Sequence, residues 1–123
     1  MSPTRMTIFA PEGMLGYGIP PRSMAEGMKR NPDALAVDAG STDPGPYYLG
    51  AGLPFTNRRA FKRDLGMILE AAYERRIPVL IGSAGGGGGA PHLEWTLDVY
   101  REVCRERDYH FRTAVIGAEV DKG

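Results

Sequence analysis

The stretch IGSAGGGGGAPH, residues 81–92, joins an apolar run to five consecutive glycines and then to a histidine. Glycine weakens strands and helix interiors, so such a run serves either a slack connector or a close approach of the backbone to something else. A strand, a glycine-rich turn and a helix start together present backbone N–H groups and a positive helix-dipole end, which suit phosphate or carboxylate. The predicted anion-binding residues of this loop are Ser83, Gly85, Gly86, Gly87, Gly88 and Gly89.

The glycine run by itself does not define a nucleotide-binding motif. Any spacing of glycines matches a run of five, so the dinucleotide pattern G-x-G-x-x-G carries no weight here. No Gly-Lys-Ser/Thr follows, which excludes a P-loop. The sequence therefore favours an anion site of unspecified class only slightly over a connector that binds nothing.

His92 lies in the first turn of the expected helix, after Pro91. The positive end of a helix dipole favours neutral imidazole, which can act as a general base, a hydrogen-bond donor or a metal ligand. A solvent-exposed histidine beside a helix cap is nearly as common, so both readings stay open at this point.

Acidic residues follow two further expected strands. Asp38 lies in the apolar run 35–39, and Glu119 follows the run 111–117. Parallel strands end at one edge of a sheet, so both carboxylates are expected near His92. Together the three side chains could move a proton or hold a divalent metal through mixed nitrogen and oxygen ligands. A carboxylate that only braces a loop is an equally common role for either acid.

The loop after residue 40 adds hydroxyls and a further acid to the same edge. Ser41 and Thr42 could orient the reacting end of a ligand, while Asp43-Pro44-Gly45 is also ordinary turn sequence. The candidate catalytic residues are therefore Asp38, Asp43, His92 and Glu119, and Ser41 and Thr42 join the ligand-binding set.

Expected strands and helices alternate along the chain, and this order predicts the scaffold that positions these residues. Residues 1–21 are expected to be irregular, with at most Thr7-Ile8-Phe9 as a short strand. Ser23 and Asn57 are the expected helix N-caps. The expected elements are helices over 21–29, 58–75 and 91–107, strands over 35–39, 77–81 and 111–117, and a long loop over 40–55.

This order predicts one α/β domain over residues 1–123, with a parallel, three-layer (αβα), Rossmann-like sheet that is small or incomplete. The run IPVLI, residues 77–81, is continuously apolar and is expected to be covered on both faces. A helix would be expected after the last strand, where the sequence stops. We therefore expect the sheet to be completed by a larger family domain, a second copy or another protein.

Composition limits the partners. The 15 basic and 15 acidic side chains balance, so nothing suggests nucleic acid, and no apolar run approaches the length needed to span a membrane. Cys104 is the single cysteine and lies on an apolar helix stripe, so it is expected in the core of a cytoplasmic protein.

Two loops and two shorter segments resemble the N-terminal region of the acyclic terpene utilisation (AtuA-like) family. The loops are AVDAGSTDPGPYYLG, residues 36–50, and IGSAGGGGGAPHLEWTLD, residues 81–98; the segments are PEGMLGYGIP, residues 11–20, and FKRDL, residues 61–65. The resemblance covers most of the chain. It implies catabolism of acyclic terpenes or related acids, often beside acyl-CoA enzymes, and leaves the reaction itself undefined.

Two functions follow as hypotheses. In the first, the chain is an enzyme or enzyme subunit of lyase or hydratase type that acts on a small carboxylate or its acyl-CoA thioester. Its cofactor is undetermined, with CoA and a divalent metal as the candidates. In the second, the chain is a non-catalytic small subunit or fragment that docks on a larger partner, which completes its fold and site. The expected protein partner is a second copy in a homo-oligomer or a larger protein.

Overall fold

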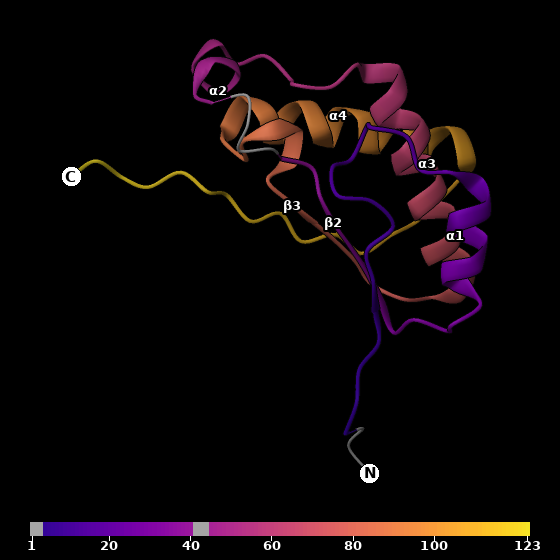
Figure 1. Cartoon of the computed structure of the whole chain (residues 1–123). Coiled ribbons are helices and arrows are strands. Elements are labelled where there is room, and N and C mark those ends of the chain that lie inside the picture. Colours follow the sequence, from indigo (N-terminus) through magenta and orange to yellow (C-terminus); the bar gives the residue numbers. More distant parts are fainter. Residues whose placement is uncertain (1–3, 41–44) are drawn as a thin grey trace.

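The computed structural model describes residues 4–40 and 45–123. Figure 1 shows helices gathered on one side of a small sheet. Along the chain the elements are β1 (Ile8–Phe9), α1 (Pro21–Met28), β2 (Ala34–Asp38), α2 (Tyr47–Ala51), α3 (Arg58–Arg75), β3 (Val79–Gly82), the 3-10 turn η1 (Ala84–Gly86) and α4 (Ala90–Arg107).

The three strands form one parallel sheet in the order β1-β2-β3. In its register Leu35 pairs with Val79, and Ala36 pairs with Leu80. Side chains alternate between the two faces of a strand, and only one face here is covered. Leu35 is fully buried, whereas Leu80 is 57% exposed. The mixed α/β class and the parallel sheet are thus confirmed, and the expected burial of both faces of residues 77–81 is wrong for the described residues.

Helices α1, α3 and α4 share one core with the covered face of the sheet. Phe61, Leu65 and Ile68 of α3 are fully buried at its centre. This confirms the apolar stripe expected for residues 58–75. Cys104 packs against the same core, and burial raises the pKa of its thiol, so it stays protonated.

Charged side chains join the outer faces of α3 and α4. Lys62 contacts Glu102 and Glu106, each at 2.8 Å, and Arg58 contacts Asp98 at 2.9 Å. These side chains are partly or fully exposed to solvent, so the ion pairs contribute little to the free energy of unfolding. The two helices lie side by side in Figure 1.

The two expected helix caps have different outcomes. Asn57 caps α3, because its side chain accepts hydrogen bonds from the backbone N–H groups of Arg59 and Ala60. Ser23 is not a cap: α1 already begins at Pro21, whose fixed φ suits the first helical position. The helix thus begins within the expected opening Pro21-Arg22-Ser23, and only the cap assignment is wrong.

Two expected loop and strand boundaries are also wrong. The segment 40–55 contains the short helix α2, which ends at Ala51 and is followed by Gly52 in a left-handed conformation. Residues 111–117 are not a strand but an extended segment, which Figure 1 shows running from the end of α4 past the sheet. The tyrosine hydroxyl of Tyr100 contacts Thr113 at 2.6 Å, so α4 rather than a strand ladder holds this segment.

The short strand expected at residues 7–9 is confirmed as β1, so the third strand of the sheet comes from the start of the chain. Within the described ranges, none of the helices combines the length and the hydrophobicity needed to cross a membrane.

Replacing Asn57 with alanine removes the cap of α3 and should lower the free energy of unfolding by about 1 kcal/mol. The matched change Ser23→Ala should cost less than about 0.5 kcal/mol, because Ser23 is exposed and makes no cap bond. Urea unfolding followed by circular dichroism measures both. Equal losses in the two variants would contradict this assignment of the caps.

Candidate functional site

The glycine run after β3 is a set of close approaches. Gly85 has φ 77°, and a Cβ there would lie 2.5 Å from the carbonyl oxygen of His92. Gly86 has φ 123°, and a Cβ there would lie 3.2 Å from Phe55. L side chains rarely adopt such φ values, and these approaches leave little space for one. The run therefore packs α4 and the segment before α3 against the end of β3.

His92 is only 1% exposed and lies in the first turn of α4. Its Nε2 lies 2.7 Å from the carbonyl oxygen of Leu53 and 3.1 Å from that of Tyr48. Carbonyl oxygens only accept hydrogen bonds, so Nε2 carries the proton and donates to both. The ring thereby ties the segment that carries α2 to the glycine loop, beside which Figure 1 places that helix.

The other ring nitrogen of His92 is buried and has no hydrogen-bond partner among the described residues. With the proton on Nε2, Nδ1 of the neutral ring is an acceptor lone pair. A buried polar atom without a partner is uncommon and calls for an explanation. His92 lines a cavity of about 80 Å³, whose other lining residues are Gly45, Tyr48, Leu49, Phe55, Gly86 and Gly87.

The backbone N–H groups expected to hold an anion are largely engaged by the protein. Gly86 donates to Ser83 at 3.0 Å, and Gly88 donates to Ala84 at 3.2 Å. The first N–H of α4, at Ala90, donates to the carboxylate of Glu119 at 2.8 Å. Glu119 thus lies where the positive end of the helix dipole favours a negative charge. A ligand anion at this helix start must replace Glu119.

The remaining predicted residues are dispersed. Asp38 accepts a hydrogen bond from Gly40 at 2.8 Å, which is the loop-bracing role. A Cβ on Gly40 would lie 2.3 Å from the Cβ of Ser83, so Ser83 packs against the end of β2. Within residues 4–40 and 45–123 no group of three His, Cys, Asp or Glu side chains could hold a metal ion. Asp38, His92 and Glu119 therefore do not form a metal-binding group among the described residues, and Ser41, Thr42 and Asp43 lie outside those residues.

Sequence reasoning missed a buried acid on α3. Asp64 is fully buried and accepts hydrogen bonds from the backbone N–H groups of Gly16, Gly18 and Ile19, at 3.1, 2.8 and 3.1 Å. An aspartate inside the apolar pattern of residues 61–72 is the signal that could have revealed it, because such a position requires hydrogen-bond donors from elsewhere.

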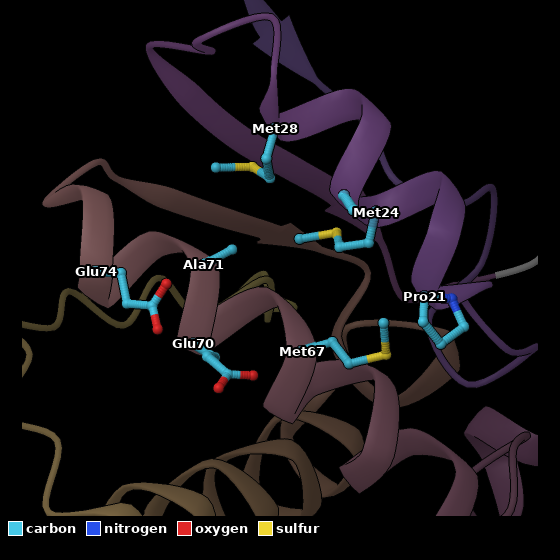
Figure 2. Close-up of a pocket in the computed structure, with 8 residues that line it drawn as sticks. Pro21, Met24, Met28, Met67, Glu70, Ala71 and Glu74 are labelled. Carbon is cyan, nitrogen blue, oxygen red and sulfur yellow. The ribbon is translucent and has the colours of Figure 1, made fainter.

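A larger hollow lies between α1 and α3 and is shown in Figure 2. It measures about 330 Å³ and is lined mainly by Met24, Met28 and Met67, with Glu70 and Glu74 on α3. Its walls are flexible thioethers, and no glycine-loop residue contributes to it. Its two carboxylates belong to side chains of one helix, and it holds no buried polar atom without a partner among the described residues, so the His92 cavity is the better candidate.

Neither family models, nor curated proteins, nor solved structures gave a match to this chain. The site is therefore defined by its own geometry: a glycine loop, a helix start and one buried imidazole nitrogen without a partner.

Gly85→Ala should lower the free energy of unfolding by about 3 kcal/mol, because it adds both a left-handed alanine and a backbone clash. Gly88→Ala is the matched control: its φ is 72°, but the nearest atom to an added Cβ is 3.5 Å away. It should lower the free energy of unfolding by about 1 kcal/mol, which is the cost of placing an alanine in the left-handed conformation. Denaturant unfolding measures the difference, and equal costs would disprove the close approach at Gly85.

Proposed function

We propose that this chain is an enzyme or enzyme subunit that binds a small carboxylate or its acyl-CoA thioester, with His92 as the group that moves a proton. The observation that carries this proposal is the buried Nδ1 of His92, which has no partner among the described residues and belongs to a cavity wall. Buried polar atoms are normally paired, so a ligand or water that donates a hydrogen bond is the natural partner.

The tautomer of His92 restricts the chemistry. In this proposal the ring is neutral, so that Nε2 donates to two backbone carbonyls and Nδ1 is the acceptor that serves as the general base. The group that enters must present an O–H or N–H, as does a hydroxy acid, a protonated carboxyl or an attacking water. This supports a hydratase or lyase reaction, in which a base takes a proton from water or from the substrate. No covalent nucleophile is needed.

The cavity fits only the reacting end of such a substrate. A volume of about 80 Å³ holds a group of a few heavy atoms, so the remainder of an acyl-CoA would lie outside it. In this proposal the carboxylate or phosphate of the ligand displaces Glu119 from the start of α4, and Ser41, Thr42 and Asp43 contribute from the loop after β2. CoA or a divalent metal would arrive with the substrate.

The metabolic setting in this proposal comes from the resemblance to the acyclic terpene utilisation family. The segments that carry the resemblance include β2 with its following loop and β3 with the glycine loop and His92. On that basis the substrate is an acid from acyclic terpene or related catabolism, processed in the cytoplasm. A Rossmann-like, three-layer sheet is part of the same proposal.

Two substitutions separate the functions of the two ring nitrogens. Glutamine at position 92 can keep an N–H near Nε2 and lacks the acceptor at Nδ1, whereas asparagine reaches only the Nδ1 position. His92→Gln should stay within about 1 kcal/mol of the parent stability. His92→Asn should lose about 1–3 kcal/mol, because the two carbonyls lose their donor.

The probes for both variants are crotonate, 3-hydroxybutyrate, crotonyl-CoA and acetyl-CoA, tested by thermal shift and for hydration of crotonyl-CoA. A probe that raises the melting temperature of the parent chain should have no effect on His92→Gln. Any turnover should fall by a factor on the order of 10² to 10⁴. Binding and turnover that are unchanged in His92→Gln would rule out Nδ1 as the acting group.

A second function rests on the uncovered face of the sheet. Ile8 and Leu80 are each 57% exposed on this face. Exposed apolar clusters of this kind mark interaction surfaces. We propose as the alternative that a second copy or a larger protein covers this face and supplies the missing helical layer.

Sedimentation of the purified chain tests this alternative. If a second copy covers the sheet, the parent chain should form dimers and Leu80→Asp should be monomeric. Val120→Asp is the matched control, since Val120 is 84% exposed in the C-terminal segment. A parent chain that stays monomeric and stable at all concentrations would exclude self-association through this face.

A further inference from the structure

The segment 12–19, between β1 and α1, donates hydrogen bonds to one buried carboxylate, that of Asp64. Asp64 accepts three of its backbone N–H groups, and Arg63 of α3 donates to the same carboxylate at 2.7 Å. Leu15 and Ile19 of the segment are fully buried, and Leu15 donates a backbone hydrogen bond to Asp38 at 2.9 Å. The segment is thus fastened to α3 and to the end of β2.

A second carboxyl group meets the first at this point. Glu12 Oε1 lies 3.4 Å from the backbone N–H of Gly16, the same group that donates to Asp64 at 3.1 Å. The other oxygen of Glu12 is buried and has no hydrogen-bond partner among the described residues. Two ionised carboxylates sharing one donor repel each other, whereas a protonated Glu12 can donate to Asp64.

The charged surroundings make Glu12 the partner that takes the proton. Four groups donate hydrogen bonds to Asp64, including the cation of Arg63, whereas Glu12 has a single donor at 3.4 Å. The acid of β2 in this region, Asp38, turns its carboxylate to Gly40. Burial and the charge of Asp64 raise the pKa of Glu12 from 4.5 to about 7.

The same segment touches the wall of the His92 cavity. A Cβ on Gly16 would lie 2.8 Å from the hydroxyl oxygen of Thr56, so the segment packs directly on the residue after Phe55. The rings of Tyr17 and Phe55 have centroids 6.3 Å apart, and Phe55 lines the cavity. A movement of segment 12–19 would therefore be transmitted to that wall through the contact of Tyr17 with Phe55.

We infer that Glu12 and Asp64 form a proton-sensitive latch, which fastens segment 12–19 to α3 when Glu12 is protonated and loosens it when Glu12 ionises. The latch acts on the side of the His92 cavity that Phe55 forms. It is a property of the fold and holds whether or not the proposed reaction is right.

The sign of the pH effect follows from linkage. The folded chain holds the Glu12 proton more tightly than the unfolded chain, so the favourable contribution is complete below about pH 4.5. It is lost as the pH rises through 7. Other groups also titrate in this range, and for that reason the test compares variants.

The first experiment measures melting temperatures of the parent chain and of Glu12→Gln between pH 5 and pH 8. Glutamine keeps the donor to Asp64 and cannot ionise, so the two proteins should melt together at pH 5. The parent should melt several degrees below the variant at pH 8. Glu94→Gln, a change at an exposed glutamate of α4, should show no such pH-dependent difference. A difference between parent and Glu12→Gln that is constant with pH overturns the latch.

Nuclear magnetic resonance on the full chain tests the mechanism directly. The carboxyl carbon of Glu12 should titrate near neutral pH, and the amide signals of Gly16 and Gly18 should follow the same midpoint. The ring signals of Phe55 should follow it too, including in His92→Gln, where no imidazole titrates at this site. A Glu12 midpoint below 5 overturns the inference, and a silent Phe55 overturns its link to the cavity.

Discussion

The contact on which the site depends is the approach of the glycine loop to the first turn of α4. At Gly85 the two backbones are so close that no side chain fits between them, and the left-handed φ excludes most residues as well. This contact places His92 under the loop, where its ring reaches the carbonyls of Tyr48 and Leu53. The positions of α2, the loop and α4 are therefore set together.

The sequence was informative wherever a pattern has a local cause. The cap at Asn57, the stripe from Phe61 to Ala72 and the strand before the glycine run all depend on residues a few positions apart, and they are found as expected. The prediction of Ser23 as an N-cap is wrong because Pro21, two positions earlier, also favours a helix start. The strand predicted over residues 111–117 is absent because a short apolar run can favour an extended chain but cannot supply a partner strand.

The candidate site was predictable only in part, for the same reason. His92 and the glycines stand out by type and spacing, and the structure brings them together. Only one of the two carboxylates joins them: Glu119 accepts from the backbone of Ala90 at the start of α4, whereas Asp38 accepts from Gly40 of its own loop. Asp64 and Glu12 meet across 52 positions of sequence through a shared amide, and no local pattern encodes such a meeting.

The order of the strands in the sheet also bears on how the chain folds. Each strand pairs with the one that precedes it along the chain, so folding closes a series of moderate loops in succession. The larger of these loops separates Leu35 from its partner Val79 by 44 positions. A sheet assembled in this way grows at its newest edge, here the outer edge of β3, and each further strand–helix unit could be added there without disturbing the contacts already made.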